Sequence, residues 1–420
     1  MTDNPSDMPS EAGWDRSLAL LREGYTFLPR RFRQYRSRVF ESRIMLERSL
    51  CLQGAEAVRF FYQPDAFTRK AAIPPTTLKL LQGRGSVQTL DGAAHRHRKA
   101  MFMSLMTPAS RARLIEVFSE EWLRRLNRWQ AEESVQLLTE AEDILCRAAC
   151  RWAGVVLPEE EAQSFGRDLA ALIEGAGSIG PRNWRGLMSR WRADRRLRAV
   201  ITDIRRSGRE ADTPAKVIAL HRDLSGKLLD VATAANELNN ILRPIVAIAR
   251  FIAFGALALH DHPAWRERLA KGDDAELEAF THEVRRYYPF FPAIAGRANT
   301  PTAFTGCPIP MGRRVIVDIY GSHRDIGAWQ QPERFLPERF LNADIPDAFL
   351  PQGGGDHFTG HRCAGEWITI DVVKAAIRHL TTSMRYEVPP QDLTVSLRRM
   401  PAKPESGFIM SRVRSVEAMV

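Results

Sequence analysis

A glycine-rich run that leads into a helix is the feature that most constrains this chain. Residues 351–366 read Pro-Gln-Gly-Gly-Gly-Asp-His-Phe-Thr-Gly-His-Arg-Cys-Ala-Gly-Glu, and residues 367–380 have the apolar spacing of a buried helix. Because glycine is costly to order, five glycines in this run predict a backbone that approaches another group closely. Cys363 lies at the entry to the helix, beside His361 and Arg362. Helix N-terminal amides and nearby cations favour a thiolate, the form of cysteine that binds metal.

The composition is that of a large globular protein. The 420 residues are 44% hydrophobic, and we expect one domain over residues 1–420, with residues 1–14 as a loose tail. The longest apolar run, residues 244–259, is too short to span a bilayer and contains Arg250, so no membrane span is expected. Five cysteines without framework spacing fit a reducing compartment and predict a cytoplasmic protein.

The positive charge does not by itself indicate a nucleic-acid partner. The chain has 60 Lys and Arg against 50 Asp and Glu, and arginines cluster at residues 30–33, 182–198 and 205–206. Such patches can bind nucleic acid. Here they lie on amphipathic helical segments, and no nucleic-acid motif accompanies them. We therefore interpret them as solvated faces with some attraction for anions, and expect no nucleic-acid partner.

Helical periodicity dominates and predicts a mainly α fold with small β-sheets. The longest predicted helix covers residues 225–262 and is apolar from 241 to 259 except at Arg243 and Arg250, so it must be buried on most sides. Further helices are expected at 56–62, 93–105, 109–157, 159–174, 185–206, 215–221, 264–270 and 274–288. Extended segments are expected at 45–52, 295–299, 314–319, 384–388, 393–397 and 408–411.

Two further motifs accompany the cysteine loop. Glu283 and Arg286 lie one helical turn apart and can pair, although a Glu-x-x-Arg is commonly a surface pair. Phe-Leu-Pro-Glu-Arg-Phe follows at residues 335–340. In this order the three segments resemble the core of the cytochrome P450 superfamily. The resemblance implies a cytochrome P450-like haem-thiolate fold, haem b bound through the Cys363 thiolate, and a structural network of Glu283, Arg286 and Arg339. Without the other motifs, a lone cysteine would be interpreted as a core residue.

The Arg243-Pro244 dipeptide lies in the long apolar helix. Burying a guanidinium there is unfavourable unless it meets an anion, and the proline should kink the helix. The alternatives are a snorkelling arginine at a kink and an anion site at Arg250, seven positions on. Ordinary haem monooxygenases carry an acid and an alcohol in this helix, and residues 239–248 have neither. The segment, like the long glycine loop, resembles the fatty-acid peroxygenase branch, where Arg-Pro replaces that pair.

The resemblance also implies contacts of the haem and the substrate. Residues 87–99 would lie over the distal haem face, with His95 and either Arg98 or Lys99 at a propionate, and Arg69 as a further propionate partner. The implied catalytic residues are Arg243, Pro244 and Gln88, and the implied substrate-binding residues are Arg243, Gln88, Phe290, Phe291 and Ala293. The sequence departs from the branch at Gln82, Phe291 and Ala293, which leaves the chain-length preference open.

The resemblance implies a peroxygenase that hydroxylates fatty acids at Cα or Cβ with hydrogen peroxide and requires no redox partner. The substrate carboxylate, paired with Arg243, would act as general acid and base. Decarboxylating relatives often carry histidine where this chain has Gln88, so we expect hydroxylation with terminal alkene as a minor product. The alternatives are a haem-thiolate monooxygenase that uses a ferredoxin or flavodoxin, and a non-catalytic haem- or fatty-acid-binding protein.

Overall fold

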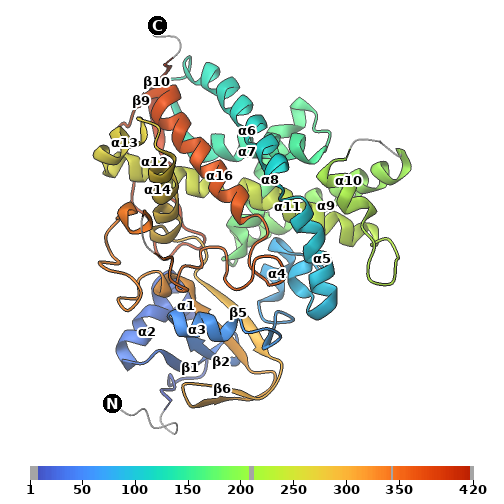
Figure 1. Ribbon diagram of the computed structural model, residues 1–420, viewed down its shortest axis with the longest axis vertical. Coiled ribbons are helices and arrows are strands. Elements are labelled where there is room, and N and C mark those ends of the chain that lie inside the picture. Colours follow the sequence, from blue (N-terminus) through green and yellow to red (C-terminus); the bar gives the residue numbers. More distant parts are fainter. Residues whose placement is uncertain (1–7, 208–211, 342–343, 417–420) are drawn as a thin grey trace.

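The computed structural model of the protein describes residues 8–207, 212–341 and 344–416. It is mainly helical with small sheets, as the periodicity predicts. In Figure 1 the largest sheet lies with α1–α3 at one end of the molecule, and the long helices fill the rest. The α-helices are α1 (Ser17–Glu23), α2 (Phe27–Tyr35), α3 (Ala55–Phe61), α4 (Pro75–Leu81), α5 (Gly92–Ser104), α6 (Pro108–Trp129), α7 (Leu137–Ala153), α8 (Glu159–Ala176), α9 (Pro181–Ser207), α10 (Pro214–Leu220), α11 (Val231–Ala247), α12 (Ala249–Asp261), α13 (Pro263–Leu269), α14 (Asp274–Tyr287), α15 (Ile319–Ser322) and α16 (Glu366–Arg378). Short 3₁₀ turns are η1 (Gly24–Thr26), η2 (Val87–Thr89) and η3 (Pro337–Phe340), and η4 (His379–Ser383) is a π turn.

Three sheets complete the fold. The strands are β1 (Val39–Ile44), β2 (Glu47–Leu52), β3 (Phe67–Thr68), β4 (Ser134–Gln136), β5 (Ala293–Ala298), β6 (Thr302–Phe304), β7 (Cys307–Ile309), β8 (Arg314–Asp318), β9 (Met384–Glu387) and β10 (Ile409–Ser415). The largest sheet has the order β1-β2-β8-β5-β3, in which only β2 and β8 run parallel. The strand expected at residues 393–397 is wrong, because that segment makes only an isolated bridge from Val395 to Pro404.

The long helix expected at residues 225–262 is two helices. The side chain of Asp230 accepts a hydrogen bond from the Thr233 amide (2.9 Å), so the helix begins at its cap and not at residue 225. Pro244 lies inside α11, and the ladder is interrupted at Ile248, whose amide bonds to the Ile245 carbonyl (3.1 Å). The interruption of the ladder thus follows the proline by about one turn.

Taken together, α11 and α12 (Val231–Asp261) are long and apolar enough to cross a membrane. The apolar run at residues 244–259, which the sequence prediction considered alone, is too short. Within the structure 94% of the most apolar window of the joined stretch is buried. Its neighbours α7, α8, α9, α14 and α16 pack around it. The stretch is therefore the central core of the helical part, which is why its faces lack the polar residues of a surface helix.

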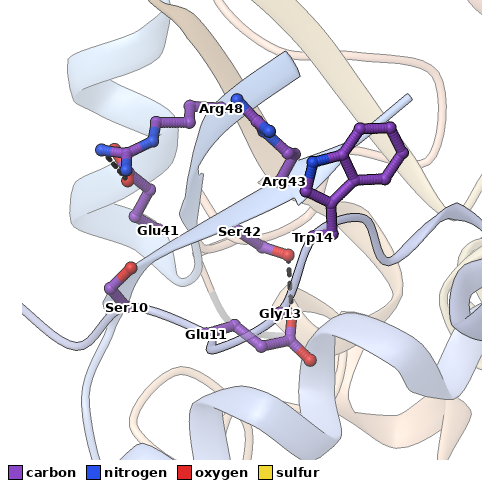
Figure 2. A pocket seen from close by; sticks show the side chains of 8 residues that line it. All are labelled: Ser10, Glu11, Gly13, Trp14, Glu41, Ser42, Arg43 and Arg48. Atoms are coloured by element: carbon purple, nitrogen blue, oxygen red, sulfur yellow. Dashed lines mark hydrogen bonds and ion pairs between the residues drawn. The ribbon is translucent and has the colours of Figure 1, made fainter. Parts of the chain in front are cut away.

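The described part of the expected N-terminal tail is attached to the sheet. Glu11 donates its amide to the Glu41 carbonyl, and Glu41 donates its amide to the Pro9 carbonyl (both 2.8 Å). Figure 2 shows the cavity beside this segment, with a volume of about 260 Å³, where Ser42 Oγ donates to Glu11 Oε2 (2.7 Å). Residues 9–11 of the expected loose tail are therefore attached to the sheet, and residues 1–7 lie outside the described part.

Candidate active site

The Cys363 loop is held by its own backbone and by close packing. The Cys363 amide donates to the Gln352 carbonyl (3.0 Å), and the Glu366 amide, at the start of α16, donates to the Cys363 carbonyl (3.3 Å). Gln352 Nε2 donates toward Cys363 Sγ (3.8 Å). Gly355 has a φ of 75°, and a Cβ there would come within 2.8 Å of the Tyr62 side chain. The predicted close approach is therefore to Tyr62, which only glycine permits.

The electrostatics of the Cys363 thiol differ from the sequence expectation. Burial, with a further contribution from Glu366, raises the pKa of Cys363. The Gly365 amide, Lys99 and Gln352 act in the opposite direction but do not prevail. The expectation that the loop alone lowers the thiol pKa is therefore wrong, because desolvation of the thiolate exceeds the effect of the amides and cations. A coordinated metal ion removes the proton outright.

The surroundings of Cys363 fit a haem iron. Cys363 as a residue keeps some exposed surface, and a Cβ added at Gly365 would meet no heavy atom within 4 Å. In the described part of the chain no group of three His, Cys, Asp or Glu side chains is arranged to hold a metal ion. A single thiolate ligand suits an iron whose remaining ligands come from a porphyrin.

Basic side chains gather beside this loop. The rings of His95, on α5, and His361 lie 3.9 Å apart, and Lys99 Nζ donates to the Arg362 carbonyl. Burial and the neighbouring cations lower the pKa of His95 to about 4 and that of His361 to about 2. Burial likewise lowers the pKa of Lys99 to about 8. Each lowered pKa shows that the protonated form of the side chain is disfavoured at this position, and a nearby anion would stabilise that form.

Arg69 belongs to the same cluster. Its guanidinium lies 4.2 Å from the Phe61 ring centroid and donates to the Ala295 carbonyl (3.0 Å). Arg69 also contributes to lowering the pKa of His361, so the two side chains are close. Among the described residues, no carboxylate forms an ion pair with Arg69 or Lys99. Haem propionates would supply the missing negative charge, and Arg69, His95 and Lys99 are the residues positioned to hold them.

Arg98 is engaged elsewhere. Its Nη1 donates to Glu237 Oε1 (2.7 Å), and the Glu237 carboxylate, on α11, is fully buried. The Val87 amide donates to the same oxygen (2.9 Å). Of the two propionate candidates that the sequence left open, the structure therefore favours Lys99, because the charge of Arg98 is already neutralised.

Arg243 and Arg250 lie in different electrostatic surroundings. Arg250 pairs with Glu174 of α8 and lies 3.7 Å from Glu142 of α7. Arg243 is 7% exposed, its Nε has no hydrogen-bond partner, and no described carboxylate pairs with it. Burial, and next the charge of Arg190, lowers the pKa of Arg243 to about 9, while Cys363 acts in the opposite direction. Arg243 is thus a buried cation near Cys363 that lacks an anion, whereas Arg250 has its own.

Gln88 lies in η2 and contacts the turn of α11 that precedes Arg243. Asn240 Nδ2 donates to Gln88 Oε1 (3.3 Å), to the Gln82 carbonyl (3.1 Å) and to Glu237 Oε2 (3.1 Å). Asn240 and Arg243 are three residues apart and share a helix face. The structure therefore brings Gln88 and Arg243 to the same part of α11.

The remaining predicted substrate residues are less closely associated with this site. The Phe290 ring packs against Phe251 of α12 (5.1 Å between centroids) and Phe291 (4.6 Å). Phe291 is 40% exposed, and Ala293 pairs with Asp318 in the sheet. Among the described residues, no hydrogen bond, ion pair or ring contact joins these three to Arg243 or Cys363.

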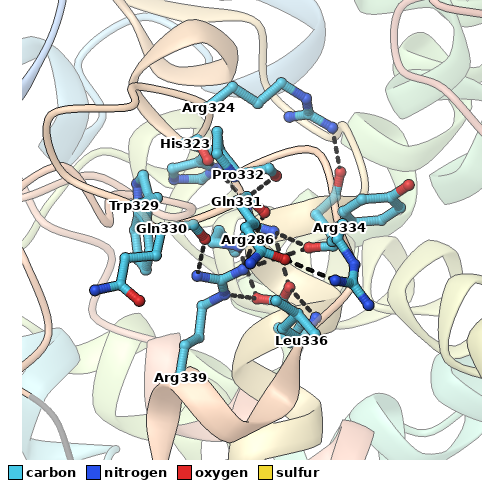
Figure 3. A network of polar contacts seen from close by, with 12 residues as sticks. Arg286, His323, Arg324, Trp329, Gln330, Gln331, Pro332, Arg334, Leu336 and Arg339 are labelled. Carbon is cyan, nitrogen blue, oxygen red and sulfur yellow. Dashed lines mark hydrogen bonds and ion pairs between the residues drawn. The ribbon is translucent and has the colours of Figure 1, made fainter.

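Figure 3 shows the polar network beneath the site. Arg286 donates from Nε and Nη2 to the two Glu283 oxygens (2.7 and 2.8 Å), and Arg339 Nε lies 3.2 Å from Glu283 Oε2. Arg286 also donates to the carbonyls of His323, Pro332 and Arg334. The predicted network is confirmed, and it ties α14 to the segment that precedes the Cys363 loop.

The sequence interpretation missed three polar residues of the site: Gln352, Glu237 and Arg190. A spacing of three residues places Glu237 and Asn240 on the same helix face as Arg243, and this spacing could have identified Glu237 from the sequence. Gln352 reaches the thiol only through the path of the loop. Arg190 lies in an arginine-rich run of which most members are solvated, so only its burial sets it apart.

These features define a haem-thiolate enzyme: a single cysteine ligand, cations for propionates and a distal helix with an unpaired arginine. A sequence model of the family "Cytochrome P450" matches residues 276–409. Cytochrome P450 138 of Mycobacterium tuberculosis is 27% identical over 338 residues, covering 72% of this chain and 74% of the relative.

Solved structures are more similar. Cytochrome P450SP alpha (CYP152B1) in complex with (R)-ibuprofen is 43% identical, covers 96% of this chain and 99% of that chain, and has a TM-score of 0.93. Cytochrome P450EX alpha (CYP152N1) with myristic acid is 39% identical over 98% and 100%, with a TM-score of 0.94. Cytochrome P450 OleT in complex with arachidonic acid is 32% identical over 98% and 99%, with a TM-score of 0.94.

The chain belongs to the cytochrome P450 family, within its CYP152 fatty-acid peroxygenases. Its cofactor is haem with an axial cysteine thiolate, for which Cys363 is the cysteine that the site presents. The one stretch in the described residues that is long and apolar enough to cross a membrane, Val231–Asp261, is a buried core helix pair.

Proposed function

We propose that this enzyme hydroxylates fatty acids at Cα and Cβ with hydrogen peroxide and without an electron-transfer partner. The observation that carries the proposal is the buried, unpaired guanidinium of Arg243 on the distal helix. Residues 239–248 hold no acid or alcohol that could deliver protons, and Glu237, the nearest acid on α11, is occupied by Arg98. The proton-transfer group must therefore arrive with the substrate.

Arg243 would bind the substrate carboxylate through two parallel charge-assisted hydrogen bonds. Pro244 follows it in α11 and helps to set the local path of the helix that directs the guanidinium. Because the head group is anchored, the carbons nearest to it, Cα and Cβ, are the ones presented for oxidation. The bound carboxylate takes a proton from hydrogen peroxide and returns it to the leaving oxygen. Haem, when bound, supplies the oxidising chemistry, assisted by electron donation from its thiolate ligand.

Gln88 bears on the product. An amide donates and accepts hydrogen bonds but does not titrate, unlike the histidine of decarboxylating relatives. We therefore assign 2- and 3-hydroxy acids as the main products, with terminal alkene as a minor one. The alternative is that Gln88 only fills the pocket and that substrate placement decides the outcome. The chain would act as one catalytic domain in the cytoplasm, which its five cysteines without framework spacing favour.

The test is turnover of a fatty acid by purified holoenzyme with hydrogen peroxide as the sole oxidant, followed by identification of the products. Hydroxy acids under these conditions are expected. Product only with reduced ferredoxin or flavodoxin would identify a monooxygenase, and no product with any donor would identify a binding protein.

Cys363→Ala tests the iron ligand separately. The reduced carbon monoxide complex of the wild type should show the red-shifted Soret band of thiolate ligation, and the variant should lose it. A variant that keeps this band would refute the assignment of Cys363.

A further inference from the structure

Helix α9 carries an uncovered aromatic stripe. Trp184, Met188 and Trp191 are 65%, 59% and 58% exposed, and spacings of four and three residues place them on one helix face. Ile179, in the loop before the helix, is 72% exposed. Single exposed apolar residues are normal, but a run of large ones along one face indicates an interaction surface.

Arginines continue the same face. Arg195 and Arg198 follow Trp191 at spacings of four and three, and Arg185 borders the stripe; all three are exposed. The Arg195 guanidinium lies 5.1 Å from the Trp191 ring centroid. None of the three forms an ion pair with a described residue. Nearby acids are already taken in the pairs Arg190–Asp194, Arg192–Asp168 and Arg196–Glu161.

We propose that this face binds the surface of an anionic lipid bilayer. The apolar half, Trp184 to Trp191, matches the aromatic anchors of interfacial helices, and the unpaired arginines match the negative charge of the headgroups. The stripe from Trp184 to Arg198 extends about 20 Å along a single helix face, which suits a flat surface. Charge complementarity and apolar insertion thus point to the same partner.

The position of α9 connects this surface with the active site. Its opposite face buries Arg190, which donates to Asn236, two helical turns before Arg243 on α11. In Figure 1, α9 lies beside α8 and α11. Helix α9 itself therefore lies between the aromatic stripe on its outer face and α11, the helix that carries the proposed carboxylate anchor Arg243. The lipid surface is argued from α9 alone and stands even if the substrate is not a fatty acid.

The experiment is co-sedimentation of holoenzyme with phosphatidylcholine vesicles, with and without phosphatidylglycerol, at low and high salt. The wild type should bind the anionic vesicles and dissociate as salt rises. The variant Arg185→Gln/Arg195→Gln/Arg198→Gln should bind about 100-fold more weakly, because each arginine near such a surface contributes about a fivefold factor.

Two further variants sharpen the test. Trp184→Ser/Met188→Ser/Trp191→Ser should lose binding and the blue shift of tryptophan fluorescence that insertion produces. Arg113→Gln/Arg124→Gln/Arg128→Gln removes the same charge from exposed sites on α6 and should bind like the wild type.

Three outcomes would overturn the proposal. The first is that the wild type does not bind anionic vesicles at low salt. The second is that the α6 control variant loses as much vesicle binding as the α9 arginine variant. The third is that light scattering shows the wild type as a dimer and the variant Trp184→Ser/Met188→Ser/Trp191→Ser as a monomer. The last would show that a second copy covers the stripe. Turnover of a short, soluble fatty acid should be equal in all variants, which separates this test from that of the catalytic function.

Discussion

Replacing Arg243 by leucine should make the substrate-free enzyme more stable. Burial lowers the pKa of Arg243 from its ordinary value to about 9, which corresponds to a cost of about 5 kcal/mol for holding the charge in the folded chain. The unfolded chain holds this proton more tightly, so the cost is present in full below about pH 9 and disappears as the pH rises from there toward the ordinary pKa of an arginine. Since the structure can relax, we expect about 1–4 kcal/mol of the cost to be recovered in Arg243→Leu.

The same substitution should abolish the fatty-acid site. Truncating one partner of a buried charge pair costs about 2–5 kcal/mol, so the fatty acid should bind at least about 30-fold more weakly. Differential scanning fluorimetry at pH 7 should show a Tm raised by a few degrees in the variant without ligand. Added fatty acid should raise the Tm of the wild type only, and titration of the Soret band measures the dissociation constants.

Arg250→Leu is the matched control. It removes the cation that serves Glu174 and Glu142, so its Tm should fall, while the affinity for the fatty acid should be spared. If Arg243→Leu is less stable than the wild type and binds fatty acid normally, the reasoning about the unpaired charge is refuted. If only Arg250→Leu loses affinity, Arg250 is the anchor.

Three further outcomes are expected. Gas chromatography of the products of Gln88→His should show more terminal alkene than the wild type, whose products should be mainly hydroxy acids; an unchanged ratio would leave Gln88 only a space-filling role. Glu283→Gln breaks the fully buried pair with Arg286 and the contact with the partly buried Arg339, and it should cost about 3–5 kcal/mol, measured as a lower Tm and less haem retained after purification. Burial raises the pKa of Asp318 from 3.8 to about 8, so the stability it contributes is present below about pH 4 and lost as the pH rises to about 8. Asp318→Asn should therefore raise the Tm less at pH 5 than at pH 9, and an equal effect at both values would contradict the raised pKa.

The sequence by itself determined the elements of the site whose chemistry is local. The Glu283–Arg286 pair follows from a spacing of one helical turn, and the glycine loop at Cys363 from backbone conformations that other residues avoid. The apolar surroundings of Arg243 already indicated a cation in need of an anion. Each of these is a property of neighbouring residues, so a linear pattern contains it.

The tertiary structure decided how charges are shared between distant segments. The pairing of Arg98 with Glu237 and of Arg250 with Glu174 joins residues 139 and 76 positions apart, and it leaves Lys99 and Arg243 without a carboxylate from the described residues. The raised pKa of Cys363 likewise depends on burial by the assembled fold. The sequence gives the type and charge of each residue. Which cation is paired with a carboxylate depends on packing, because electrostatic interactions act through space and not along the chain.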